Sequence, residues 1–85
     1  MSPPQPAIDR KAQAILGTIA AAGRPETIST TRLEDAIILA TRTYRRDRMK
    51  ELIRALEVLG YIEMSETPGV WRLRYERAGL ATEGG

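Results

Sequence analysis

The chain contains no cysteine and no histidine among its 85 residues. This composition excludes disulfide bonds and thiolate chemistry, and it removes both the commonest metal ligands and the commonest general base. Glu34 and Asp35 are adjacent rather than facing, so they offer no carboxylate pair, and no phosphate-binding or dinucleotide-binding glycine loop occurs. We therefore expect a protein that is not an enzyme and that uses no cofactor and no metal.

Aromatic residues are also scarce, at 5% of the chain, and phenylalanine is missing. Because apolar residues make up 42%, a core must be built mainly from Ile, Leu, Val and Ala. The length leaves room for one small domain. No apolar run approaches the ~20 residues of a membrane-spanning helix, and the N-terminus lacks a secretory pattern. We expect a cytoplasmic protein without a membrane partner.

The charges nearly balance, with 13 basic and 11 acidic residues and a net charge of +2. A total this small identifies no partner, so the distribution of charge has to carry the argument. Six cations fall within residues 42–54, interrupted only by Asp47 and Glu51. They are Arg42, Arg45, Arg46, Arg48, Lys50 and Arg54.

Residues 1–6 contain three prolines and no periodicity, which predicts a flexible lead-in. A first helix is predicted from Ala7, because apolar residues then recur on one helical face, and Gly23 and Pro25 end it. That face comprises Ile8, Ala12, Ile15, Leu16 and Ile19.

A second, short helix is predicted to begin at a capping box, in which Thr31 and Glu34 satisfy each other's backbone donors. Its buried stripe is Leu33, Ala36, Ile37 and Ala40. The apolar pattern lapses at 41–44, so we predict a turn there, with Thr43 as the cap of the next helix. One continuous helix over 32–59 is the alternative, because neither glycine nor proline occurs within it.

The third helix carries an apolar stripe on one side and charges on the other. The stripe is Met49, Leu52, Ile53, Leu56 and Leu59. Gly60 can adopt the left-handed conformation that ends a helix, and a strand-like run over 61–64 follows it directly.

Two alternating runs after Gly60 predict a β-hairpin, joined by 65–69 with Pro68 and Gly69 at the turn. In the second run Trp71, Leu73 and Tyr75 point to one side, and Arg72 and Arg74 to the other. Earlier in the chain, Thr27 and Ile28 favour an edge strand. Residues 77–81 allow one helical turn within a short C-terminal tail, 77–85.

The order of helix, short strand, helix, turn, helix and hairpin resembles the winged helix-turn-helix domain, in particular small transcription regulators of the MarR and PadR type. The likeness is densest at Leu52-Ile53-Arg54-Ala55-Leu56-Glu57-Val58-Leu59-Gly60-Tyr61-Ile62, followed by Trp71–Tyr75 and Gly79-Leu80. It implies an α+β fold of three helices plus a C-terminal wing over 7–76. Regulators of those families carry extra helices for dimerisation, whereas this chain has none of real length after Tyr75.

The resemblance implies sequence-specific binding of double-stranded DNA, with helix 44–59 in the major groove and the 61–75 wing on the backbone. Such a transcription regulator would be nucleoid-associated, with a possible homodimer through the first helix or the wing side. The predicted DNA-binding residues are Arg42, Tyr44, Arg45, Arg46, Arg48, Lys50, Arg54, Arg72 and Arg74.

Each of these residues also has a structural interpretation. The charged face of the third helix could simply be solvated, with local ion pairs such as Asp47–Lys50 or Arg54–Glu51. Arg72 and Arg74 could protect the edge of a strand from pairing with another chain. Trp71 is expected in the core, whereas Tyr44 and Tyr61 could lie at its edge or on DNA. Two other functions stay open: a protein-interaction module with an apolar groove, and a DNA-coating or partition protein with little sequence preference.

Overall fold

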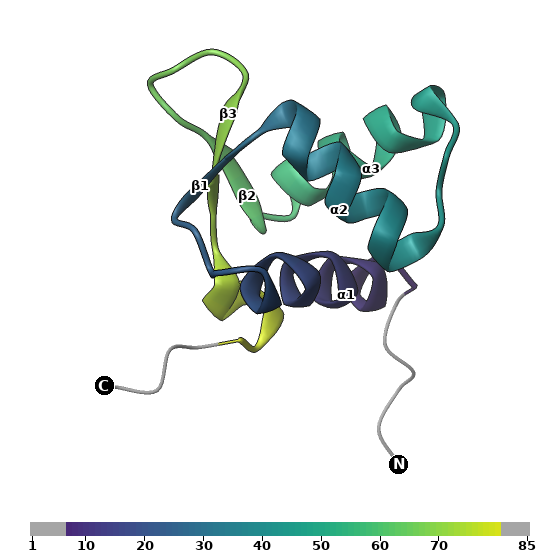
Figure 1. Ribbon diagram of the computed structural model, residues 1–85, viewed down its shortest axis with the longest axis horizontal. Coiled ribbons are helices and arrows are strands. Elements are labelled where there is room, and N and C mark those ends of the chain that lie inside the picture. Colours follow the sequence, from purple (N-terminus) through teal and green to yellow (C-terminus); the bar gives the residue numbers. More distant parts are fainter. Residues whose placement is uncertain (1–6, 81–85) are drawn as a thin grey trace.

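A computed structural model describes residues 7–80 of the chain, which form three α-helices, three short strands and one 3-10 turn. The elements are α1 (Ala7–Ala21), β1 (Thr27–Ser29), α2 (Thr30–Thr41), α3 (Arg46–Val58), β2 (Ile62–Met64), β3 (Val70–Leu73) and η1 (Tyr75–Ala78). In Figure 1, α1 lies beneath α2 and α3, and the strands stand to one side with the β2–β3 loop at the top of the view. The fold class is α+β, as predicted, and the arrangement is compatible with a winged helix.

The strands form one antiparallel sheet in the order β1-β3-β2. Ile28 pairs with Trp71, and Met64 pairs with Trp71 from the opposite side. The predicted hairpin is therefore confirmed, and so is the short edge strand at Thr27 and Ile28. β3 ends at Leu73, so Tyr75 belongs to the turn after the strand rather than to the strand itself.

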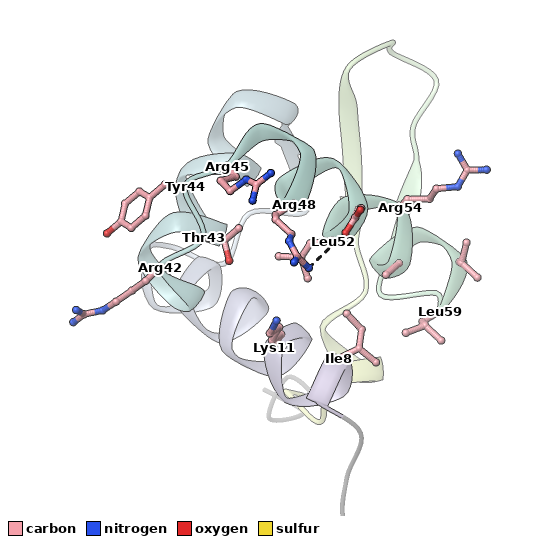
Figure 2. Close-up of a pocket in the computed structure, with 13 residues that line it drawn as sticks. Ile8, Lys11, Arg42, Thr43, Tyr44, Arg45, Arg48, Leu52, Arg54 and Leu59 are labelled. Atoms are coloured by element: carbon pink, nitrogen blue, oxygen red, sulfur yellow. Dashed lines mark ion pairs between the residues drawn. The ribbon is translucent and has the colours of Figure 1, made fainter.

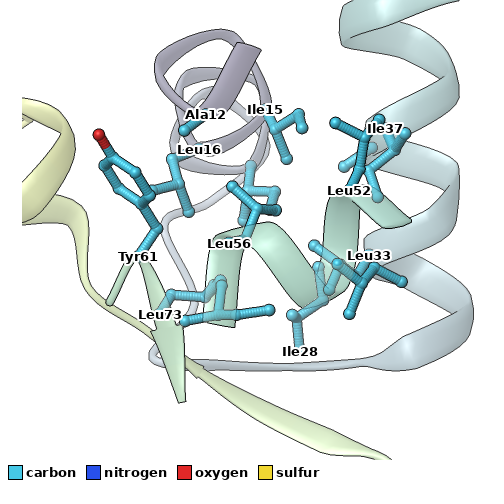
Figure 3. Packing of buried hydrophobic residues seen from close by; sticks show 14 of the residues in the cluster. Ala12, Ile15, Leu16, Ile28, Leu33, Ile37, Leu52, Leu56, Tyr61 and Leu73 are labelled. Atoms are coloured by element: carbon cyan, nitrogen blue, oxygen red, sulfur yellow. The ribbon is translucent and has the colours of Figure 1, made fainter. Parts of the chain in front are cut away.

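The core lies where the three helices meet the inner face of the sheet. Figure 3 shows Leu56 of α3 between Leu16 of α1 and Leu33 of α2, with Leu73 of the sheet beside them. These side chains are buried, as the helical periodicity predicted. The predicted stripes extend too far at three places, because Ile8 and Ala40 are only partly buried and Leu59 is 37% exposed.

The chain between α2 and α3 is a turn, so the alternative of one continuous helix over 32–59 is wrong. Arg42 adopts a left-handed conformation (φ 56°, ψ 32°), and Arg45 is extended. The predicted cap at Thr43 is also wrong: its hydroxyl accepts a hydrogen bond from the Thr41 hydroxyl at 2.8 Å. Arg45 is the N-cap of α3 and makes no side-chain capping bond.

The N-cap of α2 also differs from the predicted residue. Ser29 is the N-cap, and its hydroxyl accepts a hydrogen bond from the Arg32 amide at 3.3 Å. Because Ser29 is still paired with Val70 in the sheet, the helix begins at Thr30. Thr31 therefore lies inside the first turn and cannot form the predicted capping box with Glu34.

The end of α3 is fixed by contacts with the two ends of the described chain. Gly60 has φ +85°, and a Cβ added there would lie 3.3 Å from the Arg77 guanidinium, which itself donates to the Leu59 carbonyl at 2.8 Å. The Tyr61 hydroxyl donates to the Asp9 carboxylate at 2.7 Å, and this hydrogen bond raises the pKa of Tyr61. The positive φ favours glycine here, and a larger residue would also have to displace the Arg77 side chain.

The predicted turn at 77–81 forms two residues earlier, as η1, and Ala81 lies outside the described residues. Tyr75 is buried, which raises its pKa, and its hydroxyl donates to the Pro25 carbonyl at 2.5 Å. The Arg24 guanidinium lies 4.5 Å from the centroid of the Tyr75 ring. Ala78 is buried and Leu80 packs on the core, so the packed unit reaches Leu80.

Candidate nucleic-acid interface

The cations predicted to bind DNA lie on α3 and on the turn before it, and all six are exposed. The inward side of α3 is occupied by Met49, Leu52, Ile53 and Leu56. Because a helix has 3.6 residues per turn, Arg54 falls almost opposite this buried stripe, and Lys50 lies next to Arg54. The helix therefore presents its charges to solvent as the sequence predicted.

Four of these cations have no acidic partner within ion-pairing distance in the part of the chain that the structure describes. We call them the α3 basic surface: Arg42, Arg46, Lys50 and Arg54. The local pairs proposed as the structural alternative, Asp47–Lys50 and Arg54–Glu51, are not formed. An unpaired guanidinium keeps all its donors for an external anion.

The two remaining cations do pair locally. Arg45 lies 3.0 Å from Asp47, and Arg48 lies 4.0 Å from Glu51, one helical turn away. All four side chains are more than half exposed. Exposed pairs of this kind contribute little to stability, about 0–1 kcal/mol, so Arg45 and Arg48 can exchange their partners for a phosphate at low cost.

The hairpin arginines, Arg72 and Arg74, are held differently. Both guanidinium groups lie 3.4 Å from Glu63, which stands beside Arg72 on the neighbouring strand. The Nε of Arg74 also donates to Glu76 at 2.6 Å. This hydrogen bond lowers the pKa of Glu76 and raises that of Arg74. Both arginines are thus engaged within the protein.

A groove of about 1010 Å³ runs along one flank of α3, between that helix and the start of α1. Figure 2 shows Arg42 and Tyr44 pointing away from the body of the protein at one end, whereas Lys11 and Arg48 lie inside the groove. Lys11 belongs to α1 and was not predicted, because it is remote in sequence from the cluster over 42–54. A helical wheel of α1 places Lys11 at the edge of the core stripe, three residues after Ile8 and four before Ile15.

The aromatic residues considered for DNA contact differ in their exposure to solvent. Tyr44 is 69% exposed in the turn before α3, whereas Tyr61 is buried against α1. Trp71 is partly buried and packs on the core, and its indole nitrogen donates to the Thr30 hydroxyl at 3.0 Å. Thr30 in turn donates from its amide to the Gly69 carbonyl at 2.9 Å, so the hairpin loop is tied to the start of α2.

Within residues 7–80, no group of acidic side chains is arranged to hold a metal ion. None of the described helices has the length and apolar character needed to span a bilayer. Comparison with protein-family models, with curated proteins and with solved structures finds no match for this chain.

Proposed function

We propose that the protein binds double-stranded DNA as a small winged-helix transcription regulator, with α3 in the major groove. The observation that supports this most strongly is the α3 basic surface. Four exposed cations stand on one helix and its preceding turn without an internal acidic partner among the described residues. Clustered unpaired cations of this kind are the electrostatic footprint of a nucleic-acid-binding protein.

The dimensions of α3 support the same proposal. An α-helix with its side chains is about 10–12 Å across, and the major groove is about 12 Å wide. Arg46 and Arg54 are separated by about 12 Å along the helix axis, at about 1.5 Å per residue. One can therefore contact a phosphate while the other reaches a guanine edge in the groove.

The hairpin takes a secondary role in this proposal. Its loop is anchored to the start of α2 through Thr30, so it moves with the helices and can lie against the DNA backbone beside α3. Because Arg72 and Arg74 are already paired, they contribute less to binding than the α3 basic surface does.

Salt dependence tests the proposal directly. We expect a labelled duplex of about 20 base pairs to bind with an affinity that falls as salt rises, with a log–log slope of about −0.9 per neutralised phosphate. Four unpaired cations predict a slope of about −3.6. Fluorescence anisotropy over a salt series gives this slope, and an affinity that stays flat between low and moderate salt contradicts the proposal.

A comparison of promoter-derived and random duplexes in the same assay separates a sequence-specific regulator from a DNA-coating protein. The regulator prefers one promoter-derived duplex, whereas a coating protein binds both equally and its footprint spreads from one site. If the protein binds as a homodimer, the footprint covers two half-sites about 34 Å apart.

A further inference from the structure

The flank of α3 that faces the start of α1 carries apolar side chains outside the buried core. Besides its buried stripe, the helix places Ala55, Val58 and Leu59 in the wall of the α1–α3 groove, next to Leu52. Val58 is 76% exposed and Leu59 is 37% exposed. Ala55 and Leu59 follow Leu52 of the buried stripe at intervals of three and four residues, so this stripe widens along one flank of the helix into a partly exposed apolar strip.

The apolar strip continues onto α1. Ile8 lines the same groove, and Figure 2 shows it facing Leu59 across the end of the groove that lies furthest from Arg42 and Tyr44. Contacts with phosphates explain the cations of this groove but not its apolar strip, because the edges and backbone of a duplex are mainly polar. The strip is therefore the part of the groove that an apolar partner would cover.

The charges around the strip specify that partner further. Five of the side chains that line the groove are cations, and the single acid, Glu51, already lies beside Arg48. The cations are Lys11, Arg42, Arg45, Arg48 and Arg54. A groove lined by apolar and basic side chains is complementary to a helix that has an apolar stripe and acidic flanks.

We propose that the α1–α3 groove is a docking site for an acidic amphipathic helix of a partner protein. The apolar residues of that helix pack on Ile8, Ala55, Val58 and Leu59, and its carboxylates pair with Lys11, Arg48 and Arg54. Because Arg54 belongs to the α3 basic surface, the helix and a DNA duplex exclude each other. This last consequence rests on the proposed function, whereas the docking itself does not.

The test uses a synthetic helical peptide of about 15 residues, with Leu at the i, i+3, i+4 and i+7 positions and Glu on the flanks. We expect the full-length protein to bind this labelled peptide in an anisotropy titration. A peptide of the same composition with its Leu stripe scrambled binds at least about tenfold more weakly. Equal binding of both peptides, or no binding of either, overturns the proposal.

A matched pair of variants locates the site. Val58→Glu puts an acid on the strip, and Leu39→Glu makes the same change on α2, where Leu39 is 74% exposed and lies outside this groove. We expect Val58→Glu to weaken peptide binding at least about tenfold and Leu39→Glu less than about twofold. Equal effects of both variants, with both still folded by circular dichroism, overturn the assignment.

Competition with an unlabelled duplex completes the test. If the duplex displaces the peptide, the result supports overlapping binding sites that share Arg54. If the duplex binds without displacing the peptide, mutual exclusion is overturned. If the peptide fails to bind but Val58→Glu weakens duplex binding more than Leu39→Glu does, the strip belongs to the DNA interface and the proposal is wrong. A duplex that does not bind at all contradicts the proposed function, while the peptide titrations still decide the docking site.

Discussion

The α3 basic surface and the hairpin arginines contain the same kind of side chain in opposite electrostatic settings. Arg46 and Arg54 stand on a helix whose nearby acids contact other cations or none, whereas Arg72 and Arg74 share Glu63, and Arg74 also binds Glu76. The number of arginines in a segment therefore says less about anion binding than the acids around each of them.

The contrast arises from secondary structure. On β3, Arg72 lies directly opposite Glu63 of β2 in the sheet register. Side chains at opposed positions on adjacent strands are close enough for opposite charges to pair. On α3, neighbours must be three or four residues apart to meet, and only Arg48 and Glu51 form such a pair in this helix. Arg45, at the N-cap, pairs with Asp47, and Arg46, Lys50 and Arg54 stay available for a partner.

The largest expected effect comes from removing the available cations. Arg46→Ala with Arg54→Ala should weaken duplex binding by about 2–6 kcal/mol, because each contact contributes about 1–3 kcal/mol and residues this far apart act additively. The slope of affinity against salt should shrink by about 0.9 for each of the two arginines that contacts a phosphate. Fluorescence anisotropy measures both quantities.

The matched control for this variant is Arg72→Ala with Arg74→Ala, which removes the same charge from the hairpin. We expect a loss below about 1 kcal/mol, since these guanidinium groups are already paired at the surface. An equal loss from both double variants would remove the distinction between the two regions.

A gain of binding is the second expected effect. Glu63→Gln takes away the acid that Arg72 and Arg74 share, so Arg72 should then resemble the α3 basic surface, whereas Arg74 keeps its pair with Glu76. We expect duplex affinity to rise about two- to fivefold, or up to about 1 kcal/mol. Glu66→Gln removes the same charge from the exposed hairpin loop, and it should raise affinity less. Identical gains would show that net charge alone is responsible.

The smallest expected effect concerns acid pH. Because the hydrogen bond from Arg74 lowers the pKa of Glu76, the folded state holds the proton on this carboxyl less tightly than the unfolded state does. The stabilisation is therefore present above the unfolded pKa, at about 4.3, and is lost as pH falls through the lower folded value. The melting temperature of the wild type should drop more between about pH 5 and about pH 3 than that of Glu76→Gln. Glu66→Gln serves as the control, and its melting temperature should fall as much as that of the wild type. If it falls as little as that of Glu76→Gln, the assignment is contradicted.

The periodic parts of the fold could be predicted from the sequence because they depend on local spacing. The buried faces of α1 and α3 follow from apolar residues three and four apart, and the hairpin follows from alternation on both sides of Gly69. The caps could not be predicted in this way. Ser29, Thr30 and Thr31 can all cap a helix, and the choice depends on how far β1 pairs with β3.

The candidate site was predictable only in part. The exposed cations of α3 follow from the helical wheel, but their freedom from acidic partners depends on side-chain placement that no spacing rule fixes. The opposite holds for Arg72, whose pairing with Glu63 depends on the register of two strands joined by a loop. Lys11 joins the groove through the tertiary placement of α1, which the local sequence does not encode.

The most direct test of the central claim follows all the arginines in one titration. Nitrogen-15 and proton spectra of the arginine side chains, recorded while a duplex of about 20 base pairs is added, report each guanidinium separately. We predict large shifts for Arg42, Arg46 and Arg54 and small ones for Arg72 and Arg74. Shifts confined to the hairpin arginines, or no shift at saturating duplex, would contradict the account.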